Sequence, residues 1–368
     1  MPRLSEIVER FGKAYLRRRG GRVPAYQRKA LRAIAACRTR RLGGVRRACA
    51  HCGHAHVRWH SCRNRHCPRC GAQKQREWVE QRLRELPPVP YVHLVFTVPD
   101  TLAEHCRADP EALYRSLFEA ASQSVLQLCA SRHGCKPGLI AILHTWGQNL
   151  HLHPHVHLIA TAGGLTPGGD WKPTAQGYFL PVRALSAIFR AKCLAAVQRQ
   201  GQSLPRKRLH KKWVVHARAP QAGPNSLLLY LAGYIHRVAI DEKRLLHVDD
   251  ETVTFRYKDY RDGGRGKTMK LDGEEFLRRF LQHVLPSGFV KVRHYGLFAH
   301  AAKAAALTRL RRGLRRAGSR VAEKAALILA LLRDFQPPGP IRCPRCRSTR
   351  LEASELMPEP VPAVFQPP

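Results

Sequence analysis

The chain has 368 residues, 44% of them hydrophobic, which is long enough for two or three domains with sizeable cores. Its 64 Lys and Arg residues outnumber 26 Asp and Glu residues, and the formal net charge of +38 indicates a polyanionic partner, most commonly nucleic acid. The longest apolar run near the C-terminus, 325–332, is too short to cross a bilayer, and the N-terminus has no apolar signal core. We therefore expect a cytoplasmic, nucleoid-associated protein that does not bind membranes.

The N-terminal region contains no acidic residue between Phe11 and Arg76. Within it, the apolar residues around Ala30 and Ile34 have helical spacing, with arginines on the opposite face. Because an acid-free run of this length suits contact with phosphates, we predict a domain over 1–85 that combines basic helices with a metal-binding module.

The metal-binding module is predicted from two CxxC pairs, Cys49 with Cys52 and Cys67 with Cys70. Fourteen residues separate the pairs, a spacing that allows four thiolates to surround one tetrahedral Zn²⁺. Four further residues, Cys62, His54, His60 and His66, are alternative ligands: any one could replace a thiolate, or a second ion could bind. The grouping of the cysteines favours metal binding in a reducing compartment over a disulfide framework.

Arginines surround these pairs, and we predict that Arg63, Arg65 and Arg69 contact DNA phosphates. A further pair near the C-terminus, Cys343 and Cys346, has no second pair after it. It is half a zinc knuckle, which is either a remnant or joins cysteines elsewhere in the chain.

The middle of the chain alternates strands and helices irregularly. Strands are predicted at 91–99, 138–147, 153–164 and 213–218, a hairpin at 253–271, and helices at 77–87, 112–129, 183–200 and 226–237, with further helices to about residue 333. The hairpin favours an α+β fold with an antiparallel sheet flanked by helices over a parallel one. We assign 86–300 to a catalytic domain, 301–340 to a basic helical region, and 341–368 to a disordered tail with a CxxC pair and many prolines.

Histidines occupy alternate positions in the strand predicted at 153–164 and just before it: His151, His153, His155 and His157. Alternate residues of a strand share one face, so these imidazoles can converge on a divalent ion. Pro154 weakens the strand before it, which makes His155 and His157 the best-ordered pair. Imidazole suits Mn²⁺ or Zn²⁺, and it accepts Mg²⁺ when phosphate oxygens complete the coordination shell.

Two tyrosines, Tyr230 and Tyr234, lie four residues apart in the helix predicted at 226–237, so both project from one face. Such a pair is often core packing, but His236 and Arg237 follow it and could bind phosphate or transfer a proton. A phenol has a reference pKa near ~10 and needs a metal or a base to become a nucleophile.

Taken together, HPHVH and the downstream YLAGYIHRVAI resemble the HUH-endonuclease transposases of the insertion-sequence-ninety-one type. The segments LRAIAACRTRRLGG, CAHCGH and SCRNRHCPRC resemble the zinc-binding domain of the same family, and KVRHYGLFAH is also similar, so the resemblance runs from about residue 25 to 300.

The resemblance implies an HUH-endonuclease-like fold that nicks and rejoins single-stranded DNA at transposable-element ends, in a rolling-circle-like reaction. It implies that His155 and His157 bind the catalytic Mg²⁺ or Mn²⁺, that Tyr230 and Tyr234 are the nucleophiles, and that zinc is structural. His153 matches a histidine often seen before the HUH pair. A third metal ligand is expected, and Gln148 and His236 are candidates.

Two other functions remain compatible with these features. A relaxase or rolling-circle replication initiator would share the HUH chemistry, although the N-terminal zinc module favours the transposase. A non-enzymatic zinc-ribbon protein would explain the charge and the CxxC pairs, but neither HPHVH nor the tyrosine pair.

Overall fold

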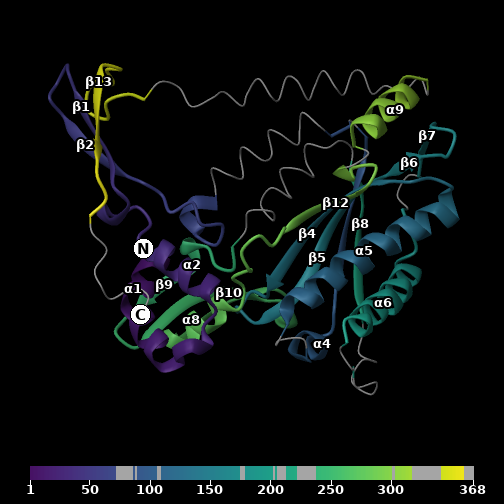
Figure 1. Ribbon diagram of the computed structural model, residues 1–368, viewed down its shortest axis with the longest axis horizontal. Coiled ribbons are helices and arrows are strands. Elements are labelled where there is room, and N and C mark those ends of the chain that lie inside the picture. Colours follow the sequence, from purple (N-terminus) through teal and green to yellow (C-terminus); the bar gives the residue numbers. More distant parts are fainter. Residues whose placement is uncertain are drawn as a thin grey trace.

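The computed structural model describes residues 1–71, 86–87, 89–105, 109–174, 179–201, 204, 213–221, 238–300, 303–316 and 341–359. Its helices are α1 (Leu4–Arg19), α2 (Ala25–Ala35), α4 (Asp100–His105), α5 (Pro110–His133), α6 (Val182–Arg199), α8 (Gly273–Leu281) and α9 (Lys303–Arg316) (Figure 1). Its strands are β1 (Gly44–Cys49), β2 (Ala55–Trp59), β3 (Tyr91–Thr97), β4 (Gly138–Trp146), β5 (Leu152–Thr161), β6 (Gly163–Leu165), β7 (Trp171–Pro173), β8 (Val214–Gln221), β9 (Leu245–Val248), β10 (Thr252–Asp259), β11 (Arg265–Asp272), β12 (Val292–Gly296) and β13 (Leu351–Leu356).

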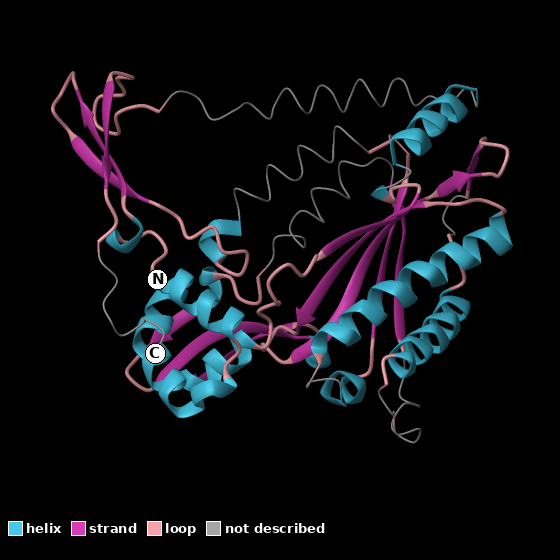
Figure 2. Cartoon of the chain, in the orientation of Figure 1, coloured by secondary structure: helices cyan, strands magenta, loops and turns pink. Residues whose placement is uncertain are grey.

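The largest sheet has five antiparallel strands in the order β12-β4-β5-β3-β8. Helices α5 and α6 cover one of its faces (Figure 2), and an apolar core fills the space between, with Phe96 and Leu158 from the sheet and Phe189 from α6. Helix α5 begins where Asp109 caps it by accepting a hydrogen bond from the Ala112 N–H. The predicted α+β fold with an antiparallel sheet is therefore confirmed.

A second core joins the N-terminus to residues from the middle of the chain. Helices α1 and α2 pack with α8 and with the antiparallel sheet β11-β10-β9, burying Phe11, Leu31, Phe255 and Phe276. Gln27 on α2 also donates a hydrogen bond to the Leu281 carbonyl at 2.9 Å. Elements of the predicted ranges 1–85 and 86–300 thus share this core. Residues of the second range also belong to the core between the large sheet and α5 and α6, and to a third core that includes Ile140, Ile142 and Ile159 of the same sheet.

The two ends of the described chain meet in a small sheet of order β13-β1-β2 (Figure 1, upper left). Residues 341–359 therefore depart from the expectation of a disordered tail. The reason is that β13 pairs with β1, in which Cys49 lies opposite Leu351, and such a distant partner leaves no local pattern in the sequence.

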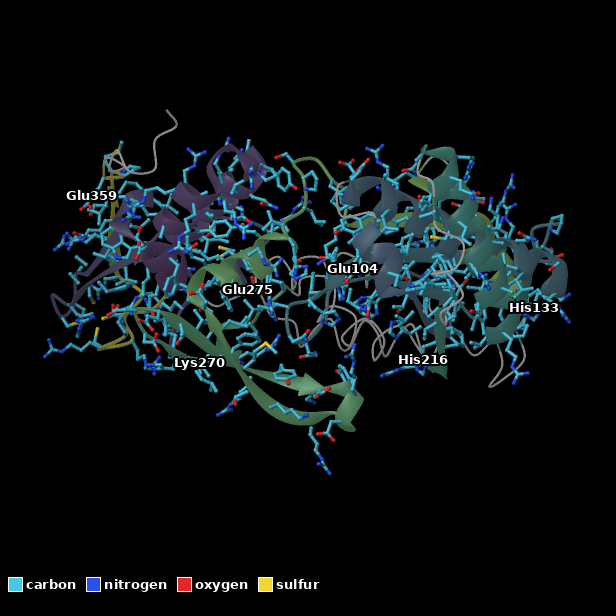
Figure 3. The ribbon with its side chains drawn as sticks, turned by 90° about the horizontal axis from the view of Figure 1, so that it is seen from below. Glu104, His133, His216, Lys270, Glu275 and Glu359 are labelled. Atoms are coloured by element: carbon cyan, nitrogen blue, oxygen red, sulfur yellow. The ribbon has the colours of Figure 1, made fainter. Side chains whose placement is uncertain are left out.

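Other predicted elements fall differently. Strand β12 lies in a region predicted to be helical, and it pairs with β4 at the edge of the large sheet. Strands β10 and β11 form the predicted hairpin, which projects from the body and carries Lys270 (Figure 3). The helix predicted at 226–237, and nearly all of that at 77–87, lie outside the described residues. None of the described helices combines the length and apolarity needed to cross a bilayer.

The core shared by α1 and α8 depends on a glycine at the start of α8. A β-carbon at Gly273 would lie 2.3 Å from the ring of Phe11, which is itself buried. We expect Gly273→Ala to destabilise the protein by about 1–3 kcal/mol through overpacking, seen as a lower melting temperature. Gly266→Ala on β11, where a β-carbon meets nothing within 4 Å, is the control. Equal melting temperatures for the two variants would contradict this packing.

Candidate active site and metal centres

The second face of the large sheet carries a group of three histidines from two adjacent strands. In the antiparallel register of β4 and β5, His144 lies directly opposite His155, and His157 follows two residues later on the same face. One ring nitrogen from each of these residues lies within 4.8 Å of the others. The three imidazoles therefore form a donor set suited to one divalent ion.

His144 lies beside His155 and His157, where the third ligand that the sequence left open would be expected. Its side chain is 3% exposed, and its ring stacks on Trp146 with 4.7 Å between centroids. Gln148, one of the two candidates, lies in the turn after β4, where its carbonyl accepts a hydrogen bond from Arg244. His236, the other, lies outside the described residues. Only the hairpin register, which pairs residue 144 with 155, could have revealed His144 from the sequence.

Hydrogen bonds orient the rings of His155 and His157. The Nδ1 of His155 donates to the His153 carbonyl at 2.7 Å, which leaves its Nε2 as the ligand atom. The Nδ1 of His157 lies 2.9 Å from Nε2 of the buried His93 on β3. If His157 binds a metal through Nε2, its Nδ1–H donates to His93, so His93 is a positioning residue. Burial lowers the pKa of His155 to about 4, which keeps it neutral and able to bind a metal.

His153, predicted as a possible ligand of the same ion, lies in a different group. Its Nδ1 is 3.2 Å from the Asp100 carboxylate at the start of α4, and His151 completes this second, more exposed cluster. The two-residue period of the strand places His153 on the same face as His155. Because β5 begins only at Leu152, His151 lies before the strand and His153 at its start. These two histidines lie beside the three-histidine group and not within it.

A tight turn joins the two histidine strands and anchors them to the N-terminal core. At Gly147, a β-carbon would lie 1.9 Å from the His151 ring, so no side chain fits there. Leu150 has a positive φ of 62°, and its side chain is fully buried among residues of α1, α2 and α8. Its carbonyl accepts hydrogen bonds from Gln282 at 2.7 Å and His283 at 3.1 Å. The core thus holds Leu150 in a conformation that costs about 1–3 kcal/mol.

The cysteines predicted to hold one zinc ion are divided between two clusters. Cys67 and Cys70 lie with Cys37 and Cys62, whereas Cys49 and Cys52 lie with the C-terminal pair. In the first cluster, Cys37 and Cys62 each lie 3.6 Å, sulfur to sulfur, from Cys70. A tetrahedral zinc tetrathiolate with Zn–S bonds of about 2.3 Å has sulfurs ~3.8 Å apart, so the cluster fits that ion.

The hairpin β1–β2 explains why one ion cannot bind both predicted pairs. Cys49 and Cys52 lie at its tip, and the five residues of β2 extend ~17 Å before the chain reaches Cys62. At the base of the hairpin, the Arg38 N–H donates to the His60 carbonyl, which brings Cys37 beside Cys62. Cys37 was missed because it has no CxxC partner.

The three arginines predicted to contact DNA differ in their surroundings. Arg65 donates to three carbonyls, those of Leu285, Pro286 and Phe289, at 2.6–3.2 Å. Its guanidinium therefore fixes the zinc-binding module against the segment before β12, while the residue remains exposed, and its predicted phosphate contact stays a prediction. Arg63 is exposed and Arg69 half-buried, and their predicted DNA contacts remain predictions. Tyr230, Tyr234 and Arg237 lie outside the described residues.

Two family models match the chain. One, described as a transposase zinc-binding domain, matches residues 7–98, and the other, described as a putative transposase, matches residues 138–305. The first range contains the cluster of Cys37, Cys62, Cys67 and Cys70, and the second contains the three-histidine group.

Two curated proteins are similar over most of the chain. A putative transposase, y4qJ, from Sinorhizobium fredii is 39% identical over 322 residues, covering 81% of this chain and 81% of that protein. The transposase for insertion sequence element IS801 from Pseudomonas savastanoi pv. phaseolicola is 29% identical over 289 residues, covering 72% of this chain and 68% of that protein. No solved structure matches.

The first cysteine cluster leads to a direct measurement of metal content. We expect Cys37→Ser to lower the zinc content of the reduced, purified protein by one ion per chain, because three thiolates leave the tetrahedron incomplete. Cys129→Ala, which removes a buried cysteine outside both clusters, should leave the zinc content unchanged. Atomic emission spectrometry gives the stoichiometry, and a Cys37→Ser protein with the full zinc content would contradict the role of Cys37 as a required zinc ligand.

Proposed function

Because this chain belongs to the transposases of the insertion-sequence-ninety-one type with an N-terminal zinc-binding domain, we propose that it nicks and rejoins single-stranded DNA at transposable-element ends through a phosphotyrosine intermediate. Such an enzyme cleaves DNA and transfers strands. The rolling-circle-like route and the preference for single strands are part of the proposal. Both curated relatives carry the name transposase, which favours this function over a relaxase, a replication initiator or a non-enzymatic zinc-ribbon protein.

The observation that carries the proposal is the convergence of His144, His155 and His157 on one face of the sheet. Two of these side chains have their Nδ1 atoms engaged by neighbours, as metal-binding histidines commonly do. A bound Mg²⁺ or Mn²⁺ would polarise the scissile phosphate and offset charge that develops on it. Phosphate oxygens and water would complete the octahedral shell that these ions prefer.

The tyrosines belong to a segment whose described neighbours lie at opposite ends of the sheet. Gln221, just before the segment, pairs with Tyr91, whereas the histidine end of β3 is Thr97, about 20 Å away at ~3.3 Å per residue. After the segment, Ile240 is buried in the core that contains Leu150, beside the histidine strand. A helix over 226–237, as the sequence predicts, would cover about 18 Å of the distance between the Gln221 end of the sheet and its histidine end. This supports a placement of Tyr230 and Tyr234 near the metal-binding face.

The proposed reaction exchanges one phosphodiester for another. A tyrosine oxygen attacks the phosphorus after its proton passes to a base, and a bond forms between them. The bond from phosphorus to one deoxyribose oxygen breaks, and that oxygen leaves as a hydroxyl group. Because the phosphate remains esterified, a second hydroxyl can rejoin the strand without ATP. Two tyrosines would allow two such exchanges to proceed in sequence.

Positive charge on the projecting hairpin β10–β11 supports the DNA-binding part of the proposal. Arg256, Arg261 and Arg265 are exposed along it, and Lys270 lies on the same hairpin (Figure 3). Asp259 and Asp262 hold Lys267 at 2.8 Å and 3.0 Å, and Asp262 also lies 3.6 Å from Arg265. We propose that this hairpin, together with Arg63, Arg69 and Arg237, follows the DNA backbone through phosphate contacts.

Loss of His144 should impair metal binding and cleavage together. We expect His144→Ala to weaken Mn²⁺ binding by at least about tenfold and to abolish nicking of a labelled single strand from the element end, as should Ala at His155 or His157. Mn²⁺ affinity is measured by electron paramagnetic resonance and nicking on a denaturing gel. His247→Ala, an exposed histidine on β9, is the control. Wild-type nicking by His144→Ala would remove this residue from the site.

The tyrosines can be separated by single and double substitutions. Phe at both Tyr230 and Tyr234 should abolish the covalent protein–DNA adduct and leave DNA binding nearly intact, because only two hydroxyl groups are lost. If both act in turn, each single variant should still cut but fail to complete strand transfer. If one only packs, its variant should behave like the wild type, and we then expect Tyr234, which adjoins His236 and Arg237, to be the nucleophile. An adduct formed by the double variant would contradict the phosphotyrosine mechanism.

A further inference from the structure

The two ends of the described chain carry a pair of turns with the same backbone form. In one, the Gly53 N–H donates to the Cys49 carbonyl at 2.9 Å, and in the other the Arg347 N–H donates to the Cys343 carbonyl at 2.9 Å. Both donor residues have a positive φ, 69° at Gly53 and 62° at Arg347. Arg347 adopts this conformation without being glycine, so the surrounding structure must hold the turn in place.

The four cysteine sulfurs of these turns face one another. The sulfur of Cys49 is 3.5 Å from that of Cys346, and the sulfur of Cys52 is 3.7 Å from that of Cys343. All four lie within 4.8 Å of one another. These separations are close to the ~3.8 Å expected between the thiolates of a tetrahedral zinc site with Zn–S bonds of about 2.3 Å.

Backbone pairing brings the second turn to the first. Strand β13 runs antiparallel to β1 from Cys49 opposite Leu351 to Gly44 opposite Leu356. The Ala50 N–H adds a hydrogen bond to the Arg350 carbonyl at 3.1 Å. A β-carbon at Gly43 would lie 2.4 Å from the Leu356 carbonyl oxygen, so the close approach of the strands requires glycine.

Apart from the backbone pairing, few interactions other than those of the cysteines can stabilise this sheet. No described residue of β1, β2 or β13 belongs to any of the three apolar cores, and Val57 on β2 is 40% exposed. The ion pairs at its edge, His60 with Glu355 and Arg40 with Glu359, are exposed, and such pairs contribute little. Small sheets without an apolar core generally need a metal or disulfides to be stable.

We propose that Cys49, Cys52, Cys343 and Cys346 hold a second structural zinc ion, which fastens the C-terminal strand β13 to the N-terminal hairpin. This site is thus assembled from two turns, whose residues Cys52 and Cys343 lie 291 residues apart in the sequence. Just beyond β13, the Glu359 N–H donates to the carbonyl of Arg40, which lies shortly before β1 (Glu359 is labelled in Figure 3). The proposal is independent of the catalytic mechanism, because it concerns only the metal content and the position of the chain end.

Zinc stoichiometry in the full chain tests the proposal. The wild type should contain two zinc ions per chain, and the double variant Cys343→Ser/Cys346→Ser should contain one. Cys129→Ala should retain two. The single variant Cys346→His should also retain two, because imidazole can replace one thiolate in a zinc site. A single ion in the wild type, or two in the double serine variant, would overturn the proposal.

A second measurement on the wild-type protein avoids any folding defect in the variants. Alkylation by N-ethylmaleimide, followed by peptide mass spectrometry, should leave Cys343 and Cys346 unmodified until a chelator removes zinc, and both should then react. Equal reactivity before and after zinc removal would contradict coordination by these thiols. So would an intact mass, measured without reductant, that shows disulfides between the two pairs.

Discussion

The antiparallel register of β4 and β5 is the constraint on which the rest of the catalytic half depends. It sets His144 opposite His155, and the two-residue period of the strand adds His157 to the same face. The same register turns Leu143, Val156 and Leu158 to the other face, where α5 and α6 bury them. A slip of one residue would exchange the faces, placing imidazoles in the apolar core and leucines where the three histidines now lie. Burial of the apolar face therefore fixes the geometry of the histidines.

The zinc-binding half and the sheet that carries the three histidines contact each other at two points. Leu150 lies in the turn between β4 and β5, and its side chain is buried in the core formed by α1, α2 and α8. Its carbonyl accepts hydrogen bonds from Gln282 and His283, which follow α8 directly. Arg65, next to the first cysteine cluster, donates to carbonyls of the segment that leads into β12, an edge strand of the same sheet. A rearrangement of the zinc-binding module would therefore shift the turn between β4 and β5 that precedes His151.

Local patterns in the sequence were sufficient for much of the fold and for part of the site. Alternation along β5 predicted that His155 and His157 share a face, and helical spacing predicted α5 and α6 almost to their ends. What the sequence could not reveal depends on partners far apart in the chain. His144 needs the register of a hairpin, Cys37 needs the base of β1–β2, and Cys343 needs a turn near the other end of the chain. Such contacts leave no periodic trace within a single segment.

The excess of positive charge also limits the stability of the folded chain. Its 26 acidic residues cannot neutralise 64 Lys and Arg side chains, and several already serve local pairs. Glu275 holds both Arg278 and Arg279, and the hydrogen bonds from Arg278 lower the pKa of Glu275 to about 2. Each tetrathiolate zinc site would add about two negative charges beside arginines such as Arg38 and Arg69. Even two such sites leave most of the net charge of +38 unbalanced. Because the remaining positive charges repel one another, binding of a polyanion such as DNA would stabilise the compact state of the protein.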